Sequence, residues 1–339
     1  MIDKTADGRQ TAVTFREAIQ VWLKVAAYSF GGPAGQIAVM HRLLVEEKRW
    51  VSESRFLHAL NYTMLLPGPE AQQLATYLGW LLHRTKGGLV AGSLFILPGF
   101  VSILALSLLY AGFQEVTFVQ ALFYGLKPAV LAIVVEAVFR IGRRALKNWV
   151  MISISALAFV AIFFLNLPFP LIVLGAGVIG YIGGKVALDK FDVIQQRQVE
   201  DEETFVITDT IAQAQRPSFS YALKVILIGG ALWFGPLFLL HSVYGGEHVF
   251  WQIGVFFSQT AVVTFGGAYA ALAYVAQQAV EVFGWLQPGE MLDGLGMAET
   301  TPGPLVQVVQ FVGFMGAFRH PEGFAPLWAG VIGSVITTW

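Results

Sequence analysis

Leu65-Leu66-Pro67-Gly68-Pro69-Glu70-Ala71-Gln72 interrupts the apolar run from Phe56 to Leu82. Each proline removes a backbone donor and clashes with the preceding turn, so a continuous helix does not pass through this stretch. The run is long enough to lie in a membrane, where freed backbone groups must find partners in protein or in a water-filled cavity. Glu70 adds an ionisable side chain where such groups are costly, which marks the stretch as a candidate functional site.

The composition of the whole chain indicates a membrane protein. Of the 339 residues, 56% are hydrophobic and 13% are charged, whereas soluble domains carry about 25% charged residues. Apolar runs recur from Phe15 to the C-terminus, which predicts an all-α polytopic membrane protein. The absence of cysteine excludes disulfides and thiolate chemistry. The six histidines form no His-x₃-His pair, and we predict no metal and no cofactor.

The broken stretch has a second copy later in the chain, and one constant offset in sequence number relates the two. Chance rarely aligns several Gly, Pro and Trp signals at one offset without a gap, so the sequence predicts an internal duplication. The matching signals are Phe30-Gly31-Gly32 with Phe265-Gly266-Gly267, Trp50 with Trp285, and Pro67-Gly68-Pro69 with Pro302-Gly303-Pro304.

The duplication divides the chain into an N-terminal repeat (1–188), a polar cytoplasmic linker (189–220) and a C-terminal repeat (221–339). Glu200-Asp201-Glu202-Glu203 lies near the centre of the linker. The last apolar run, Phe324–Trp339, has 16 residues, short of the roughly 20 that a span needs. Because the first copy continues beyond the position equivalent to Trp339, we expect the second copy to be truncated at its C-terminus.

The basic residues are distributed unevenly between the two copies. Twenty of the 21 lysines and arginines lie at or before Lys224. The loop from Arg42 to Arg55 carries four of them, and its counterpart 276–290 carries none, so the positive-inside rule places the two loops on opposite sides. Five expected spans between the halves give the same inversion. We therefore predict inverted-topology repeats whose broken segments are re-entrant hairpins rather than kinked spans, each repeat continuing in transmembrane helices.

Each Gly/Pro break predicts the start of a new helix, and a helix N-terminus is a ready anion site. Two inverted copies bring these N-termini toward the midplane, where we predict a cradle for a small anion. The alternative is that the breaks only permit close helix packing. The candidate substrate-binding residues are Gly31, Gly32, Pro33, Gly68, Pro69, Gln72, Gly266, Gly267, Thr300, Thr301, Gly303 and Gln307.

Three ionisable residues are candidates for coupling or gating. Glu70 is expected at the second position of its half-helix, and its counterpart is Leu305. One hypothesis is that Glu70 titrates and gates anion occupancy; the alternative is a simple helix-capping carboxylate. Lys24 either attracts anions into the path or extends to the membrane interface. Glu299, beside Thr300, is a second candidate for titration.

Long stretches of the chain resemble the chromate transporter family. They are Phe30-Gly31-Gly32-Pro33-Ala34-Gly35-Gln36-Ile37-Ala38, Arg49-Trp50, the run from His58 to Tyr77, Thr264-Phe265-Gly266-Gly267 and Thr301-Pro302-Gly303-Pro304. The resemblance implies a bacterial inner-membrane protein that exports chromate and confers chromate resistance, with sulfate as the analogous anion. It also implies two homologous halves of opposite topology. Long members of the family continue past the position of Trp339.

The function expected from these observations is secondary transport of chromate. Moving one charge through 100 mV is worth about 2.3 kcal/mol, so a dianion leaving an interior-negative cell gains roughly 4.6 kcal/mol. Proton coupling through Glu70 is a further hypothesis. The alternatives are a sulfate or other oxyanion transporter, an anion channel, and an intramembrane enzyme acting on a lipid phosphate. We expect no enzyme, because Glu70 stands alone near the breaks, with no nearby histidine or catalytic serine cluster. The expected partners are chromate or sulfate, membrane lipid and no nucleic acid, with a homodimer left open.

Overall fold

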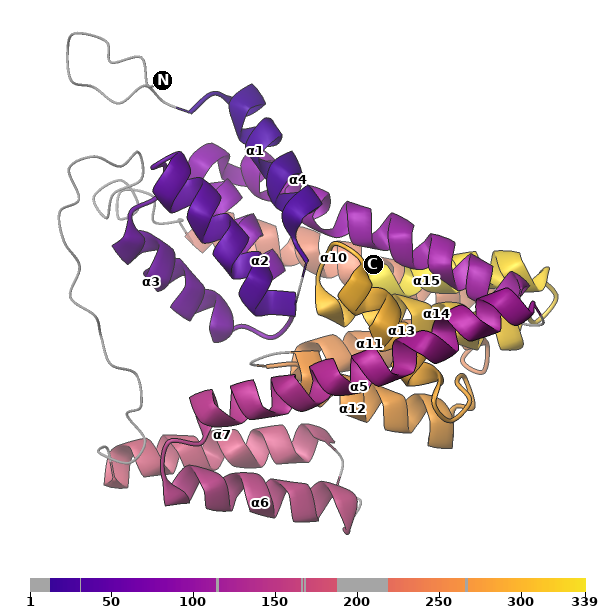
Figure 1. The fold of residues 1–339 in the computed structure, drawn as a ribbon. Coiled ribbons are helices and arrows are strands. Elements are labelled where there is room, and N and C mark those ends of the chain that lie inside the picture. The colour runs from indigo at the N-terminus through magenta and orange to yellow at the C-terminus, as the bar shows by residue number, and fades with distance from the viewer. Residues whose placement is uncertain are drawn as a thin grey trace, which may run out of the picture. The chain divides into compact units, whose positions relative to one another are not determined.

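The computed structural model describes residues 13–30, 32–113, 116–165, 167, 169–187, 219–265 and 268–339 (Figure 1). All regular elements in these ranges are helices, which confirms the predicted all-α class. Contacts divide the chain into two compact units, Met1–Leu126 with Val199–Trp339, and Lys127–Gln198. The predicted linker 189–220 lies outside the described residues, apart from Phe219 and Ser220. The division into repeats at 1–188 and 221–339 stays a prediction.

The part of the first half that has a counterpart in the second half contains five elements, and we call this part the first copy. Thr14 accepts a hydrogen bond from the Glu17 N–H at the start of the first helix, and Ser52 accepts one from Arg55 at the start of the third. The breaks lie at the predicted places, between the first two helices and between the third and the fourth. The elements are α1 (Phe15–Tyr28), α2 (Gly32–His41), the π-helical η1 (Arg42–Glu47), α3 (Glu53–Met64) and α4 (Glu70–Gly112).

Helix α4 turns back on itself at His83 and Arg84, whose backbone angles are not helical. Its two arms approach closely at glycines: a Cβ added to Gly87 would overlap the carbonyl oxygen of Gly79. Small residues at such a contact let two helices pack backbone to backbone. The helix therefore folds back at His83 and Arg84, and α4 is a helical hairpin.

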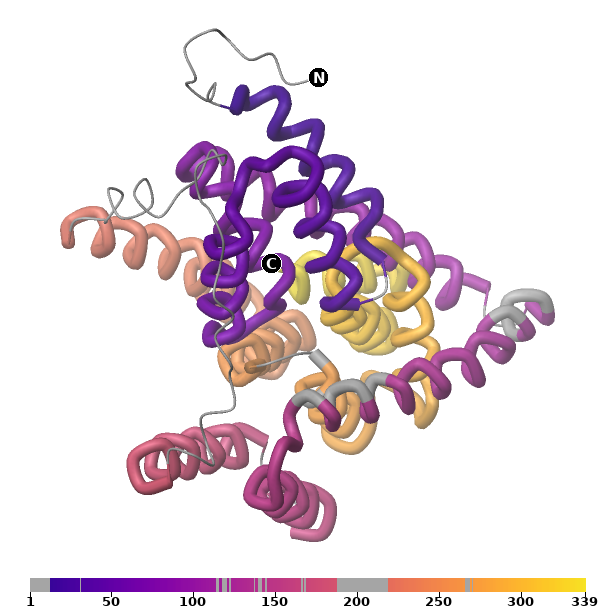
Figure 2. Tube along the Cα trace, turned by 60° about the vertical axis from the view of Figure 1, so that its left-hand side comes forward, coloured from indigo at the N-terminus to yellow at the C-terminus, as the bar shows by residue number. Residues whose placement is uncertain are grey.

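Three helices in the described part of the chain are long and apolar enough to cross a membrane: α4, α7 (Phe169–Val186) and α10 (Phe219–Tyr244). Along the chain, α5 (Thr117–Ala145) and α6 (Trp149–Phe163) come between α4 and α7. In the second unit, α6 lies beside α7 (Figure 2). The 15 residues of α6 are fewer than the roughly 20 expected of a full span. The chain is a multi-pass membrane protein, and the count of five spans between the halves stays a prediction.

The second half repeats the order and spacing of the first. When Pro67 is aligned with Pro302, the element boundaries from α11 to α14 agree, to within two positions, with those from α1 to the first arm of α4. Gly68 and Gly303 share a φ of 115°, a conformation that only glycine adopts readily. The opposite orientation of the two copies stays a prediction. The elements are α11 (Val249–Val263), α12 (Ala268–Gln277), η2 (Gln278–Val282), α13 (Glu290–Thr300), η3 (Leu305–Gln307), α14 (Val308–Arg319) and α15 (Pro326–Thr338).

The buried core of the first copy fixes its Pro-Gly-Pro turn. Trp22 from α1, Phe56 from α3 and Leu74 from α4 are almost fully buried in one hydrophobic cluster. In a membrane, such side chains stabilise the contact between helices mainly through close van der Waals packing. Because the cluster holds the helices on both sides of Pro67-Gly68-Pro69, the turn between them is fixed in position.

Candidate functional site

The two Pro-Gly-Pro turns lie against each other's copies through a reciprocal pair of hydrogen bonds. The N–H of Gly68 donates to the carbonyl oxygen of Thr264 at 2.7 Å, and the N–H of Gly303 donates to that of Ser29 at 3.0 Å. Ser29 and Thr264 are themselves equivalent positions of the two copies. Such reciprocity is the mark of a twofold interface. In this conformation, two predicted anion donors, the amides of Gly68 and Gly303, hold the copies together.

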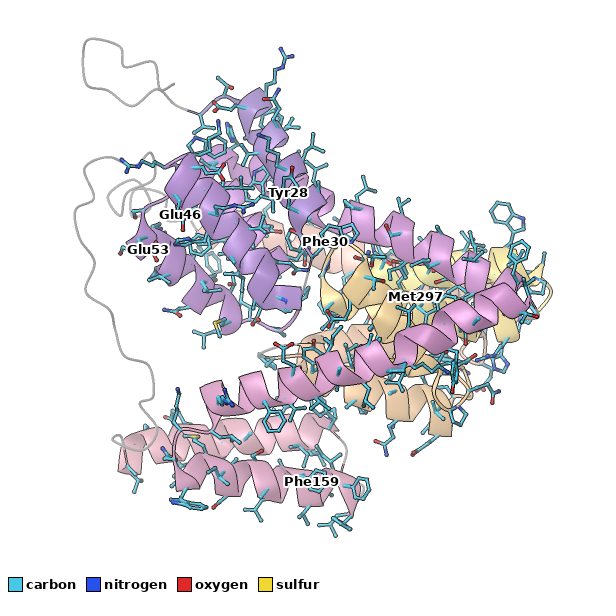
Figure 3. The ribbon with its side chains drawn as sticks, in the orientation of Figure 1. Tyr28, Phe30, Glu46, Glu53, Phe159 and Met297 are labelled. Carbon is cyan, nitrogen blue, oxygen red and sulfur yellow. The ribbon has the colours of Figure 1, made fainter. Side chains whose placement is uncertain are left out.

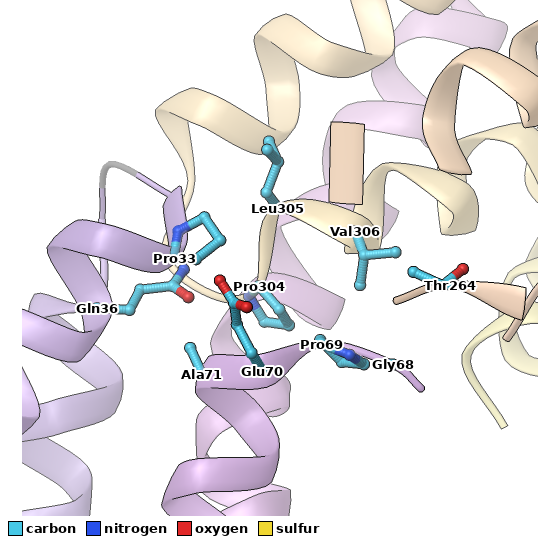
Figure 4. A pocket seen from close by; sticks show the side chains of 10 residues that line it. All are labelled: Pro33, Gln36, Gly68, Pro69, Glu70, Ala71, Thr264, Pro304, Leu305 and Val306. Carbon is cyan, nitrogen blue, oxygen red and sulfur yellow. The ribbon is translucent and has the colours of Figure 1, made fainter. Parts of the chain in front are cut away.

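One pocket lies where the two turns meet (Figure 4). In this conformation its cavity volume is about 10 Å³, room for about one water molecule, and the wider 320 Å³ between the lining atoms includes open solvent. The first turns of α2 and α4 contribute from the first copy, and the start of η3 contributes from the second. The pocket is lined by Pro33, Gln36, Gly68, Pro69, Glu70, Ala71, Thr264, Pro304, Leu305 and Val306. Four predicted site residues therefore come together here: Pro33, Gly68, Pro69 and Glu70.

The sequence predicted Glu70 at the second position of its half-helix, but the structure has it as the first residue of α4. The difference arises at Pro69, whose ψ of 105° is extended, so that this proline is the N-cap. The carboxylate still lies at a helix N-terminus, where the helix dipole favours negative charge. Leu305, its counterpart, lines the same pocket from the other copy.

Gln36 is a pocket residue that sequence reasoning did not single out as functional. Its Nε2 donates to the Gly303 carbonyl oxygen at 2.5 Å, and the residue is 1% exposed. Its Oε1 is buried and has no hydrogen-bond partner among the described residues. The available signal was spacing, because Pro33 and Gln36 are three apart on one helical face. Figure 4 shows both side chains at the pocket.

Thr300 and Thr301 do not offer their hydroxyl protons to the pocket. The hydroxyl of Thr300 donates to the Gly296 carbonyl at 2.7 Å, and that of Thr301 donates to the Met297 carbonyl at 2.8 Å. A hydroxyl has one proton to donate, and bonding back to the preceding turn is a common use of threonine near a helix end. Neither threonine lines the pocket, so this conformation does not support their predicted donor role.

Gln307 binds backbone and another glutamine instead of lining the pocket. Its Nε2 lies 3.3 Å from both the Ile96 carbonyl oxygen and Gln310 Oε1. Gln310 Nε2 in turn donates to the Phe100 carbonyl at 3.0 Å. Both carbonyls flank Pro98 in the second arm of α4, where the helix lacks a backbone donor. The two glutamines thus clamp the second Pro-Gly-Pro turn onto α4. The predicted ligand Gln72 also lies outside the pocket lining.

The remaining predicted residues lie away from the pocket or outside the described residues. Lys24 is exposed on α1. Glu299 accepts a hydrogen bond of 2.7 Å from the Tyr269 hydroxyl. Gly32 begins α2 with a φ of 71°. Gly31, Gly266 and Gly267 lie outside the described residues. Within the described ranges, no group of three or more potential ligand side chains is placed to hold a metal ion.

A partly buried ion pair lies at the end of α14 in the second copy. Arg319 binds Glu290 through two contacts of 2.7 Å and also donates to the Trp285 carbonyl at 2.7 Å. The Tyr110 hydroxyl lies 3.1 Å from carboxylate oxygens of both Glu290 and Asp293. The sequence marked Arg319 as the last basic residue but not its partners. Its pairing explains how one arginine is accommodated in a half otherwise free of lysine and arginine after Lys224.

The equivalent region of the first copy combines partly exposed charges with the buried Arg55, which stands at the position of Glu290 and donates to the Tyr77 hydroxyl at 3.0 Å. His41 contacts Glu46 at 3.0 Å and Glu53 at 2.5 Å, and Lys48 contacts Glu17 at 2.9 Å. Figure 3 labels Glu46 and Glu53 in this region. Exposed pairs of this kind contribute little, typically about 0 to 1 kcal/mol each. The exposed pairs at the basic loop of the first copy therefore add little to its stability.

Comparison with known proteins gives one consistent family. The sequence profile described as chromate transporter matches residues 16–181 and 251–339. The chain is 31% identical to the chromate transport protein of Pseudomonas aeruginosa, over 97% of this chain and 73% of that protein. It is 30% identical to the probable chromate transport protein of Synechococcus elongatus, over 90% and 70%. It is 29% identical to the chromate transport protein of Cupriavidus metallidurans, over 93% and 72%. No solved structure matches the chain.

Proposed function

This chain belongs to the chromate transporter family, and from that premise we propose that it is a secondary transporter exporting chromate across the bacterial inner membrane. The similar proteins from Pseudomonas aeruginosa and Cupriavidus metallidurans are named chromate transport proteins. The family is one of transporters and not of enzymes.

The observation that carries the proposal is the meeting of two Pro-Gly-Pro turns at one pocket. The turns come from equivalent positions of the two copies, and the helical elements that follow them both begin at the pocket. Helix N-termini present unpaired N–H groups and partial positive charge, which suit an oxyanion. In transporters built from inverted repeats, the substrate binds at broken helices between the repeats. The pocket lies at broken helices between the two copies, which supports the proposal.

The direction of transport follows from charge. A dianion leaving an interior-negative cell gains roughly 4.6 kcal/mol per 100 mV, so export can run on the membrane potential alone. Import of the same dianion needs several co-transported cations. Energetics therefore supports export, and a bacterial inner membrane supplies the required potential.

Glu70 gives the pocket a means of regulation. An ionised carboxylate at the start of α4 competes with an oxyanion for the same N-terminus, because both carry negative charge. Protonation removes that competitor and lowers the local negative charge. The proposal is therefore that Glu70 titrates during transport and links anion occupancy to protons. The alternative is that Glu70 only caps α4.

Sulfate is the second substrate to consider, because it shares the charge and tetrahedral shape of chromate. The same pocket is also compatible with an anion channel through the opposed turns. The hydrogen bonds from Gly68 to Thr264 and from Gly303 to Ser29 close the two copies onto each other. A closed contact of this kind favours a transporter that alternates between states over an open conductance.

The test is labelled chromate uptake into everted membrane vesicles, with and without an imposed potential. We expect saturable, concentrative uptake that collapses when the potential is removed and that excess sulfate reduces. Glu70→Gln is expected to flatten the pH dependence of uptake. Absence of chromate uptake by wild-type protein would overturn the function. Flux that rises with chromate concentration without saturating would indicate a channel, and an unchanged pH profile in Glu70→Gln would leave Glu70 as a cap.

A further inference from the structure

Gln36 reaches across the interface between the two copies, and its orientation is determined by its partner. The carbonyl oxygen of Gly303 can only accept a hydrogen bond, so the amide group of Gln36 must present its Nε2 to it. Its Oε1 is then left on the other side of the amide. That oxygen belongs to a side chain lining the pocket, is buried, and has no partner among the described residues.

A buried amide oxygen without a partner requires a hydrogen-bond donor, because leaving it unpaired costs about as much as losing a hydrogen bond. The pocket side chains offer few donors. The hydroxyl of Thr264 already donates to the Thr260 carbonyl at 2.6 Å. Most of the other lining residues are aliphatic or proline. Glu70 is the one titratable side chain in the lining, and it becomes a donor when it takes up a proton. Figure 4 shows Gln36 and Glu70 at the same pocket.

We propose that Gln36 is a positioning residue that couples protonation of Glu70 to the closed contact between the two Pro-Gly-Pro turns. This inference rests on the proposed function of the pocket. Protonated Glu70 donates its hydrogen to Gln36 Oε1, while Gln36 Nε2 holds Gly303. The proton comes from water and returns to it, and no other bond changes.

Loss of that proton reverses the arrangement. The ionised carboxylate and the amide oxygen are then two acceptors in one small pocket, and their lone pairs repel each other. Rotation of the amide relieves the repulsion but gives up the bond to Gly303. The amide of Gln36 thus converts a change of charge at Glu70 into loss of its hydrogen bond to the second turn, which frees the first copy to move and opens the pocket.

The device belongs to one copy alone. The positions equivalent to Gln36 and Glu70 are Ala271 and Leu305, so the second copy supplies only the carbonyl that Gln36 holds. The pocket therefore holds one such pair of Gln36 and Glu70. Other charged or titratable groups on neighbouring elements do not line the pocket: Lys24 on α1, His41 with Glu46 and Glu53 around α2, Arg55 with Tyr77 between α3 and α4, and Tyr269 with Glu299 on α12 and α13.

The chain contains a matched control for Gln36. Gln73 Nε2 also donates to a carbonyl of a Pro-Gly-Pro turn, that of Pro67 at 2.5 Å, and its Oε1 is likewise buried without a partner among the described residues. Gln73 does not line the pocket. Gln73→Leu therefore removes the same chemistry from a turn without touching the proposed proton acceptor.

The first measurement is the pH profile of chromate uptake into everted vesicles. In Gln36→Leu, the protonated form of Glu70 loses the acceptor that stabilises it, so the proton leaves at lower pH. The midpoint should move down by about 0.5 to 1 pH unit, the value of one hydrogen bond. Gln73→Leu should keep the wild-type midpoint. An unmoved midpoint in Gln36→Leu, alongside a profile that depends on Glu70, overturns the inference and leaves the transport function standing.

The second measurement does not need chromate flux. The chain has no cysteine, so Val306→Cys places a single thiol in the pocket lining, and a small thiol reagent reports how open the pocket is. Dividing its labelling rate by the rate in a Glu70→Gln background removes the thiol's own pH dependence. We expect the ratio to rise with pH and its midpoint to fall in Gln36→Leu but not in Gln73→Leu. A ratio independent of pH, or an equal midpoint in all three proteins, overturns the inference even if wild-type protein moves no chromate.

Discussion

The first copy, α1 to α4, and the second copy, α11 to α15, place equivalent turns at equivalent positions and fill them with different side chains. Gly68 and Gly303 share one backbone conformation, and Trp50 and Trp285 are both almost fully buried. Glu70 has no carboxylate to match it in the second copy. The shared residues determine the path of the backbone, and the unshared ones supply the chemistry of the site.

The two turns also differ in how firmly they are held. In the second copy, Gly303 and Pro304 are buried and the neighbouring Gln307 is clamped to α4, whereas the equivalent Gly68 and Pro69 are only half-buried. A segment with few buried contacts opens at lower free energy than one in the core. The comparison indicates that the second turn is a fixed platform and that the first turn, with Glu70, is the part that responds.

Breaking the ion pair of the second copy should give the largest effect. Arg319→Met leaves Glu290 buried and without its guanidinium, and loss of one partner of a buried pair costs about 3 to 5 kcal/mol. We expect the free energy of unfolding in detergent to fall by that amount. The equivalent residue of the first copy is Arg84, which is exposed and lies over the Trp80 ring at 5.4 Å.

Arg84→Met is therefore the matched control for Arg319→Met. An exposed charge outside any network contributes little, so its loss should change the free energy of unfolding by less than about 1 kcal/mol. Equal losses from the two substitutions would contradict the view that the second copy is the firmly held one.

The turn glycines give the next effect. A side chain at φ 115° is strained in both turns, but a Cβ at Gly303 would lie 3.0 Å from the Gly99 backbone, whereas at Gly68 it would meet the flexible end of Gln73. We expect Gly303→Ala to cost roughly 3 kcal/mol from strain and overpacking together, and Gly68→Ala about half as much. Thermal unfolding of the purified proteins measures both. A larger loss at Gly68 would reverse the assignment of platform and moving part.

The glutamine clamp should matter less than the backbone of the turn. Gln310 is fully buried, and Gln310→Leu removes the hydrogen-bond partner of the Phe100 carbonyl and of the Gln307 amide. Two unmet groups in a buried site should cost about 1 to 3 kcal/mol. Gln72→Leu, at the position equivalent to Gln307 and half-buried, should change the free energy of unfolding by less than about 0.5 kcal/mol. Comparable losses would mean that the first turn is clamped as well.

The fold was more accessible from the sequence than the site, for a physical reason. Gly/Pro breaks, apolar runs and a constant offset act locally, so the helix boundaries on both sides of Pro67-Gly68-Pro69 were predicted. Side-chain partners depend on which segments meet in space. The hydroxyls of Thr300 and Thr301 suit an anion in composition, yet they bond to their own helix.

Gln36, Gln310 and Glu290 were missed for the same reason. Each acts on a segment far away in the sequence: Gln36 on Gly303, Gln310 on Phe100, and Glu290 on Tyr110. No local pattern in the chain indicates these pairings. The asymmetry between copies was visible at Glu70 and Leu305, but its consequence needed the pocket that brings both residues together.

Substitution of Lys48 should have the smallest effect on the free energy of unfolding. It tests how the two equivalent tryptophans, Trp50 and Trp285, are held. In the first copy Lys48 lies 5.7 Å over the Trp50 ring and 2.9 Å from Glu17, whereas its counterpart Phe283 stacks on Trp285 at 4.3 Å. The lysine contacts are partly exposed and screened by salt, so Lys48→Met should cost less than about 1 kcal/mol, and less still at high salt. Phe283→Ala should cost more and be insensitive to salt, because it removes buried ring contact. Salt-dependent unfolding of the two variants separates a copy held by solvated charge from one held by packing, and a salt-insensitive loss at Lys48 would contradict that distinction.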